Sequence, residues 1–312
     1  MASHTKKILI AGAGGHLGSR LAQYLSHRHD VHLRLTIRSS SGAHLMKYGD
    51  VIQGDLQKRE FCESVTAGCD YVVNLVGVPA ESPGRPNPVE AFAAVTRNLV
   101  ETSRQHGVRR FVHLSSIHVF GSSLHGRVSE LTDTAPLTTY ASAHWRAEKA
   151  ISVFESSGIH PLILRCGNGF GYSPSKKTTS GSQLAWDLCR QAVTENVLRL
   201  RSHGLHQRDF ITNRDIVRAV EHFVFNDAAT GVILLGSGRS MSVLEFTNLV
   251  IERVQQRFHR RPKIIVNSKD SSHPLRYELD ITRLRNRGFT LHNFFQTEID
   301  ELLSMTSDTL QL

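Results

Sequence analysis

The chain of 312 residues is 40% apolar and 21% charged, a composition typical of a soluble globular protein that buries a substantial core. It contains no repeat, no low-complexity tract and no run of about 18 apolar residues that could span a membrane, and its first apolar run begins too early to leave room for a signal peptide. We therefore expect a cytoplasmic protein without a membrane partner. The net charge of +9 favours anionic ligands, but the basic residues are not gathered with aromatic residues on one element, which argues against a nucleic-acid-binding protein.

Disulfide and metal chemistry are not expected either. Cys62, Cys69, Cys166 and Cys189 show no CxxC pairing, and the eighteen histidines are not clustered at the spacing of metal ligands. We expect reduced, buried thiols and no metal site.

The N-terminal segment combines a predicted strand with a glycine-rich turn. An apolar run at 7–13 leads into AGAGGHLGSRLAQYL, whose glycines recur every three residues and open an amphipathic helix. Glycine allows a tight turn in which a pyrophosphate approaches backbone N–H groups at the start of a helix. The placement between strand and helix predicts a dinucleotide cofactor, bound by the residues of the turn: Gly12, Gly14, Gly15, His16, Leu17 and Gly18.

The second predicted strand, at 31–37, ends with the residues that discriminate NADP from NAD. Thr36 stands where an aspartate for the ribose hydroxyls is expected, and Arg38, Ser39 and Ser40 follow it. A carboxylate would repel a 2′-phosphate, whereas an arginine beside hydroxyls suits one. We therefore favour NADP as the cofactor, with NAD as the alternative, and expect Arg38 and Ser39 to bind it.

Asp55 lies where a third strand would end. Its carboxylate could accept a hydrogen bond from the adenine amino group, or it could be the N-cap of the helix that follows. The two roles are compatible.

Further apolar runs at 71–77, 110–116 and 161–167 alternate with amphipathic stretches such as 88–107. This alternation predicts an α/β fold in which a doubly wound parallel sheet is covered by helices on both faces. After about residue 168 the pattern loosens. We expect a cofactor-binding domain over 1–167, completed by parts of 208–236, and a smaller substrate-binding α/β region over 168–312.

Several segments, in the same order and spacing, resemble the extended short-chain dehydrogenases/reductases, the epimerase/dehydratase family that acts on nucleotide sugars. They are the glycine turn, GDL, NLVG, TRNLVETSRQHGVRRFVHLSS, VFG and LRCGNGFG. The resemblance implies an NAD(P)-binding Rossmann domain, a C-terminal region for a nucleotide sugar, and a homodimer formed through helices near 90–105 and 140–157. It also implies cofactor contacts at Leu56, Val76, Gly77 and Asn98.

The segment TTYASAHWRAEK departs from this family at one position. The resemblance assigns Ser116 and Tyr140 to polarising a sugar hydroxyl or ketone, but His144 replaces the lysine that usually follows the tyrosine by four residues. Since residues four apart share a helix face, the His144 ring could bind the nicotinamide ribose and, when protonated, lower the pKa of Tyr140. We expect Tyr140 and His144 to serve both catalysis and cofactor binding, because Arg146 and Lys149 face elsewhere on the helix.

The resemblance also supplies a substrate site. Asn168, Arg208 and Arg276 correspond to contacts with the substrate diphosphate, Ser116 to a contact with the sugar, and Asp209 to a residue that holds the chain. Two arginines converging on one anion would give charge-assisted, bidentate hydrogen bonds. His118, two residues beyond Ser116, is expected to be a packed loop histidine.

These observations predict an enzyme that transfers a hydride at a ring carbon of a nucleoside-diphosphate sugar, as a 4-ketoreductase with NADPH or as an epimerase with NAD. The alternative is a non-catalytic NADP-binding sensor or scaffold of the same fold, which the exchange of lysine for His144 would suit.

Overall fold

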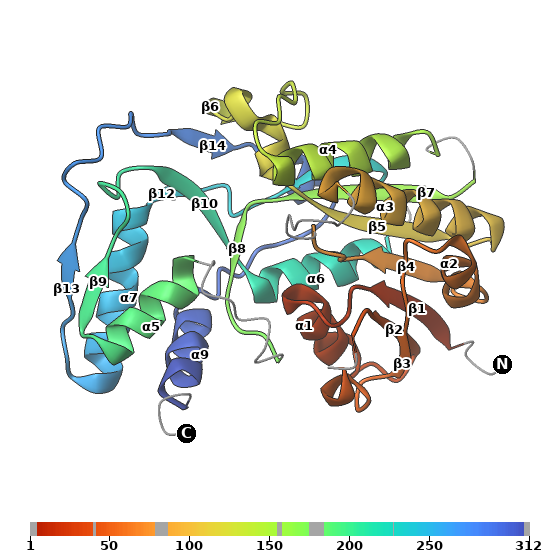
Figure 1. Cartoon of the computed structure of the whole chain (residues 1–312), viewed down its shortest axis with the longest axis horizontal. Coiled ribbons are helices and arrows are strands. Elements are labelled where there is room, and N and C mark those ends of the chain that lie inside the picture. The colour runs from red at the N-terminus through yellow and green to blue at the C-terminus, as the bar shows by residue number, and fades with distance from the viewer. Residues whose placement is uncertain are drawn as a thin grey trace.

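Seven parallel strands form the central sheet, in the order β11-β7-β5-β4-β1-β2-β3 (Figure 1). The computed structural model describes residues 5–39, 42–78, 87–154, 158–174, 184–226 and 228–308. The strands of the sheet are β1 (Lys6–Ala11), β2 (Val31–Ile37), β3 (Asp50–Gln53), β4 (Tyr71–Asn74), β5 (Arg110–Ser116), β7 (His160–Cys166) and β11 (Gly231–Leu235). The predicted α/β fold class, a Rossmann-type doubly wound sheet, is confirmed.

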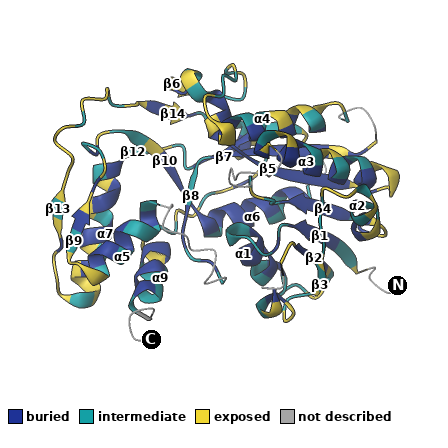
Figure 2. Ribbon diagram, viewed as in Figure 1, coloured by how far each residue is buried: buried dark blue, intermediate teal, exposed yellow. Residues whose placement is uncertain are grey.

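Helices cover both faces of this sheet, as Figure 1 shows. On one face lie α1 (His16–Leu25) and α6 (Asn213–Val224), and on the other lie α2 (Arg59–Thr66), α3 (Pro88–Gln105) and α4 (Thr139–Ser152). Alternating strand residues point to opposite faces, so Ile8 and Ile10 join the apolar cluster under α1, while Leu9 joins the cluster under α2 and α3. The inner strands β4, β5 and β7 are therefore buried on both faces, whereas the edge strand β3 is partly exposed (Figure 2).

The remaining elements form a smaller region with its own apolar cluster. Four phenylalanines pack ring against ring at its centre: Phe170, Phe210, Phe246 and Phe295. The helices of this region are α5 (Leu184–Thr194), α7 (Val243–Phe258) and α9 (Phe295–Asp308). Its short strands are β8 (Asn168–Phe170), β9 (Val197–Arg199), β10 (Gln207–Thr212), β12 (Ser240–Ser242) and β13 (Lys263–Ile265).

A few short elements complete the chain. The pair of β6 (Gly126–Val128) and β14 (Tyr277–Leu279) lies beside α4, while α8 (Thr282–Asn286) packs on β11. The 3₁₀ helices are η1 (Ala43–Leu45) and η2 (Ile117–Ser123). Within the described ranges, no helix is both long enough and apolar enough to cross a membrane.

The chain returns to the central sheet after β10. Helix α6 packs against α1, and β11 pairs with β7 in parallel. This return lies within the segment 208–236 that was expected to complete the first domain. The division at residues 167 and 168 stays a prediction.

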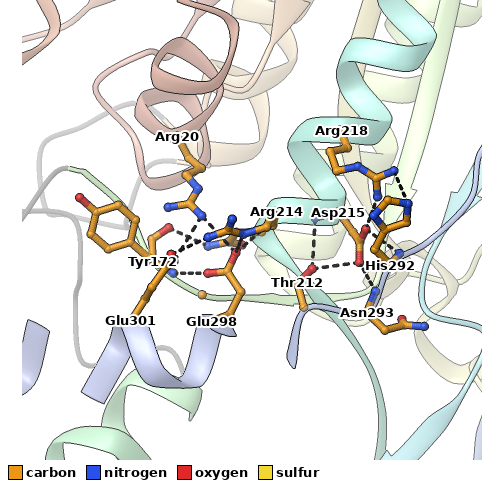
Figure 3. A network of polar contacts seen from close by, with 12 residues as sticks. Arg20, Tyr172, Thr212, Arg214, Asp215, Arg218, His292, Asn293, Glu298 and Glu301 are labelled. Atoms are coloured by element: carbon orange, nitrogen blue, oxygen red, sulfur yellow. Dashed lines mark hydrogen bonds and ion pairs between the residues drawn. The ribbon is translucent and has the colours of Figure 1, made fainter. Parts of the chain in front are cut away.

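A polar network joins the two parts of the molecule (Figure 3). The buried carboxylate of Glu298, on α9, accepts hydrogen bonds from the backbone N–H groups of Tyr172 (2.8 Å) and Arg214 (3.0 Å) and from the Arg20 guanidinium (3.3 Å). Arg20 belongs to α1, so the C-terminal helix is tied to the helix that follows the glycine turn. This network fixes the smaller region relative to the central sheet.

Candidate functional site

The glycine turn has the backbone geometry that its sequence predicts. Gly12 has a φ of +82°, and a Cβ there would lie 2.8 Å from the Leu75 carbonyl oxygen. A Cβ at Gly18 would collide with the Gly12 carbonyl oxygen. Both positions therefore need glycine, and α1 begins at His16 directly above the turn.

A cavity of about 420 Å³ opens beside this turn. It is lined by the turn, the end of β2, the segment after β3, the segment after β4 and one side of α3. Nine of the predicted cofactor-binding residues line it: Gly12, Gly14, Gly15, Arg38, Ser39, Asp55, Leu56, Val76 and Gly77. The carboxyl ends of four parallel strands thus converge on one cavity, as expected for a doubly wound sheet.

Four other predicted residues lie beside the cavity rather than on its wall. His16 Nε2 lies 3.1 Å from the Gly171 carbonyl oxygen, and burial lowers the pKa of His16 to about 4. Leu17 packs against the core, and Gly18 lies under the turn. The Asn98 amide donates to the carbonyl oxygens of Leu56 (3.4 Å) and Gln57 (2.9 Å). The structure gives Asn98 the role of holding the loop that lines the cavity.

Thr36 and Ile37 end β2, and both line the cavity. Thr36 is 1% exposed, and Ile37 Cγ2 lies 3.4 Å from where a Cβ of Gly14 would lie. The assignment of Thr36 to the position of the ribose-binding aspartate stays a prediction. Neither side chain offers a carboxylate.

Arg38 follows at the exposed rim of the cavity. No described residue forms a hydrogen bond or ion pair with its guanidinium. An arginine at a cavity rim without a protein partner is available to an anionic ligand. Ser39 also lines the cavity, and Ser40 lies outside the described residues.

Asp55 is not the N-cap of α2, which begins after Lys58. Its Oδ1 instead accepts a hydrogen bond from the Gln57 backbone N–H at 3.0 Å, which forms a local turn. The N-cap half of the expectation was wrong, since the cap is Lys58, three positions after Asp55. The carboxylate lines the cavity, as the other half requires.

Ser116, Tyr140 and His144 come together next to the cavity wall, since Phe92 lines the cavity and its ring lies 5.1 Å from that of His144. None of the three lines the cavity itself. Ser116 ends β5, and its hydroxyl accepts a hydrogen bond from the His118 backbone N–H at 3.2 Å. Tyr140 lies in the first turn of α4, which Thr138 caps by accepting from the Ala141 N–H at 3.1 Å. The ring of His144, one turn later, lies edge-on to Tyr140 with centroids 4.6 Å apart. The predicted shared helix face is confirmed.

The Tyr140 hydroxyl lies in surroundings that favour its neutral form. The side chain as a whole is 46% exposed, but burial of the hydroxyl end raises the pKa of Tyr140 above its ordinary value. A hydrogen bond from Ser116 acts in the opposite direction. At neutral pH the phenol is therefore protonated in the free protein.

His144 is not a cation in the free protein. Its side chain is 5% exposed, and burial lowers its pKa to about 4. That His144 lowers the pKa of Tyr140 when it is protonated stays a prediction. The free protein at neutral pH holds the ring neutral, because desolvation outweighs the ordinary basicity of imidazole. Lys149 lies over the Trp145 ring and Arg146 pairs with Glu90, so neither replaces the missing cation.

A second cavity of about 260 Å³ lies beyond Tyr140. Its lining includes Asn168 and Arg208, together with Thr138 and Ala141 from the start of α4. Arg276 is exposed and lies outside the lining, although its neighbours Leu275 and Tyr277 belong to it. The structure thus brings Arg208 to the cavity and does not bring Arg276 there.

Tyr277 organises the floor of the second cavity. Its hydroxyl donates to Asn168 Oδ1 at 3.2 Å and accepts from the Asp209 backbone N–H at 3.0 Å. Asp209 in turn accepts from the backbone N–H groups of Ser237 (2.6 Å) and Gly238 (2.9 Å), so it holds the chain after β11. Burial raises the pKa of Asp209 to about 6.

His118 differs from the expectation of a packed loop residue. It is exposed, lines the second cavity, and has its ring centroid 6.0 Å from that of Tyr140. Partial desolvation of the ring at the cavity wall and the nearby charge of Arg208 lower the pKa of His118. The expectation was wrong because η2 turns residue 118 outward from the end of β5.

Sequence reasoning missed three residues of the site. Phe92 lines the first cavity, Tyr277 lines the second, and His113 is fully buried behind His144. The only signal for His113 was a polar residue within the apolar run of β5. Phe92 and Tyr277 were indistinguishable from ordinary core aromatics.

His203, His206 and Asp270 also approach one another, with His203 Nε2 3.6 Å from Asp270 Oδ2. The Nδ1 atoms of His203 and His206 accept hydrogen bonds from the backbone N–H groups of Leu205 (2.9 Å) and Leu275 (3.1 Å). Both Nε2 atoms must then carry the ring protons, so they cannot act as metal ligands in this arrangement. The three side chains therefore connect the loop of His203 and His206 to the loop of Asp270.

Comparison with known proteins identifies the family. The model of the NAD dependent epimerase/dehydratase family matches residues 8–236. The low-salt glycan biosynthesis protein Agl12 of Haloferax volcanii is 24% identical over 296 residues, which cover 90% of this chain and 92% of that protein. A dTDP-glucose 4,6-dehydratase of Streptomyces niveus is 24% identical over 316 residues, covering 91% and 88% of the two chains.

Among solved structures, MoeE5 in complex with UDP-glucose and NAD superposes with a TM-score of 0.79 at 22% identity, covering 97% of this chain and 99% of that one. At this identity the likeness shows the fold. The family match, by contrast, spans the glycine turn, Ser116, Tyr140 and β11. The chain therefore belongs to the NAD dependent epimerase/dehydratase family.

Proposed function

We propose that this protein is an NAD(P)-dependent oxidoreductase or epimerase that transfers a hydride at a ring carbon of a nucleoside-diphosphate sugar. The observation that carries the proposal is the cluster of Ser116, Tyr140 and His144, which packs against the walls of two cavities. The His144 ring contacts Phe92 of the first cavity, and the Tyr140 ring lies 6.0 Å from that of His118 in the second. One cavity is lined by the glycine turn, and the other by Asn168 and Arg208. A hydroxyl or ketone that enters from the second cavity would meet the Ser116 and Tyr140 hydroxyls.

The first cavity is compatible with a dinucleotide, because two glycines let a ligand approach the backbone. A Cβ at Gly12 would press against the Leu75 carbonyl oxygen, and the space beside Gly77 is open. The glycine turn would hold the pyrophosphate, Asp55 the adenine end, and Tyr140 and His144 the nicotinamide ribose. When bound, the cofactor supplies or accepts the hydride.

NADP is the favoured cofactor. Arg38 has no partner among the described residues, and the end of β2 carries no carboxylate that would repel a 2′-phosphate. MoeE5, the neighbour of this fold described above, holds NAD. NAD therefore stays the alternative.

Tyr140 is the acid of the proposed reaction. Its raised pKa keeps the phenol protonated, so its hydroxyl can donate a proton to a ketone oxygen as hydride arrives at the carbon. The Ser116 hydroxyl would hydrogen-bond the same oxygen and orient it. A protonated tyrosine beside a neutral histidine favours net ketone reduction over the removal of a proton from an alcohol.

The second cavity is the proposed binding site for the substrate. Arg208 offers a permanent cation for a phosphate, and the Asn168 amide is held in place by Tyr277. Arg276 would need a rearrangement of its loop to add a second cation. The homodimer formed through α3 and α4 and the cytoplasmic location expected from the sequence also remain proposals.

A non-catalytic NADP sensor or scaffold is the second candidate. The absence of a cation beside Tyr140 among the described residues favours it. Arg208 beside an organised second cavity argues against it, because a protein that only senses the cofactor has no use for a substrate phosphate site.

The test is turnover of a panel of UDP-, dTDP-, GDP- and ADP-sugars and their 4-keto forms, with NADPH, NADH or NAD, followed by NMR analysis of the products. Tyr140→Phe should abolish turnover while NADPH affinity is retained. Tyr24→Phe is the matched control, because it removes a phenolic hydroxyl that bonds Glu221, away from both cavities. Turnover that survives Tyr140→Phe would refute the acid role, and binding of NADPH without turnover of any sugar would support the sensor.

A further inference from the structure

Behind the site lies a buried pair of imidazoles. His113, in the middle of β5, is 0% exposed, and His144, on α4, is 5% exposed. Their ring centroids are 6.2 Å apart. Phe92 from α3 closes the group, with its ring 5.1 Å from His144 and 6.1 Å from His113.

Three ring nitrogens of this pair are buried without a hydrogen-bond partner among the described residues: both nitrogens of His113 and Nδ1 of His144. Each such atom costs about 1–3 kcal/mol relative to a satisfied one. The surrounding side chains include Ala143, Ala147 and Phe92, none of which can donate or accept a hydrogen bond. A strand in this position would be more stable with an apolar residue at 113.

Polar groups retained at such a cost usually serve a function. His113 cannot act on a substrate directly, because its side chain is fully buried. It can act through His144, whose ring lies between His113 and Tyr140. Of the two His144 nitrogens, only Nδ1 is both buried and unpartnered.

We propose that His113 is a positioning residue, which engages Nδ1 of His144 through one internal water and thereby fixes the His144 tautomer. The separation of the rings is too large for a direct bond between them, and a bridging water needs two or more polar partners, which the two imidazoles supply. With Nδ1 accepting from the water, the ring proton lies on Nε2. His144 then presents an N–H donor to the site, the part that an ammonium group would otherwise play.

This inference rests on the proposed function for its effect on turnover, but its structural content does not. The experiment is ¹⁵N NMR of the histidine-labelled full chain, with and without NADPH, together with kcat and NADPH affinity. The wild-type protein should show His144 in the Nε2–H form. His113→Phe should give a mixture of His144 tautomers and lower kcat by about tenfold, an effect comparable with the loss of one positioned hydrogen bond, while NADPH affinity changes less than twofold.

His113→Asn should restore part of both effects, because its amide can still bond a water. Val112→Ala is the matched control, a buried apolar change in the same strand that points to the opposite face. A His144 tautomer that is the same in His113→Phe as in Val112→Ala would overturn the proposal. If no sugar is turned over, the proposed function fails, whereas the tautomer measurement still decides the role of His113.

Discussion

Glu148 accepts hydrogen bonds from Nε (3.1 Å) and from a terminal nitrogen (2.8 Å) of Arg165, and the side chains are 6% and 9% exposed. The Ser115 hydroxyl donates to the same carboxylate at 2.6 Å. Helix α4, which carries Tyr140 and His144, is thus fastened to β5 and β7 by a buried ion pair. Such a pair is costly to break, because the remaining charge stays buried.

We predict that Glu148→Leu destabilises the protein by about 3–5 kcal/mol, since it leaves the Arg165 charge unpaired. The double variant Glu148→Leu/Arg165→Met should recover most of this loss. Urea unfolding measures both free energies. Glu90→Ala is the control, because it breaks the exposed pair with Arg146 and should cost no more than about 1 kcal/mol. A double variant as unstable as the single one would show that packing, rather than the unpaired charge, dominates.

Arg38 should determine whether the protein prefers NADPH or NADH. Removal of a guanidinium that bonds a phosphate costs about 2–3 kcal/mol, so Arg38→Ala should weaken NADPH binding roughly 30- to 150-fold and leave NADH binding unchanged. The change is measured by titration of both cofactors, using energy transfer from the tryptophans. Arg285→Ala is a control at the opposite edge of the sheet, where α8 packs on β11. Equal losses for both cofactors would mean that Arg38 does not contact a 2′-phosphate.

His144→Lys should keep or raise turnover and widen its pH range. An ammonium group near Tyr140 favours the phenolate and lowers the pKa of the tyrosine, so Tyr140 could act as acid or base near neutral pH. The protein should be less stable, since the position is 5% exposed. The pH dependence of kcat and the spectrophotometric titration of the phenol measure these effects. Complete loss of turnover would show that the imidazole performs a task that lysine cannot.

The free energy of unfolding should fall as the pH drops from about 6.5 toward 4. Burial lowers the pKa of His16 and His144 to about 4, that of His113 to about 3, and that of His118 as well, so the unfolded chain takes up protons at four histidines before the folded chain does. Asp209, with a pKa raised to about 6, and Glu298, whose pKa is also raised, oppose this trend, but they are two groups against four.

The contribution of one residue, His113, to this pH dependence of stability can be measured. In His113→Phe the slope of unfolding free energy against pH should be smaller by about 1.4 kcal/mol per pH unit between 4 and 6, the contribution of one proton. Urea unfolding at several pH values measures it. An unchanged slope would mean that His113 is protonated in the folded protein.

The sequence predicted the central sheet well, because strands buried on both faces are short, continuous apolar runs. It failed where a short element turns the chain. His118 was expected to pack within its loop, but η2 turns it outward from the end of β5 to the second cavity.

Long-range pairing limited the prediction of the second cavity. Strand β14 pairs with β6, and each strand has only three residues. Nothing local in either segment predicts this partner. The register that carries Leu275 and Tyr277 to the cavity, and leaves Arg276 outside it, was therefore not accessible from the sequence.

The bond between Arg20 and Glu298 spans 278 residues of the chain. During synthesis, the helix beside the glycine turn is made 278 residues before the carboxylate that neutralises its buried arginine. Until α9 is made, Arg20 and Arg214 lack this shared counter-ion, and the interface between the two regions carries excess positive charge. The nascent protein can form its central sheet before then, but the polar network between the two regions is complete only after Glu298 has left the ribosome.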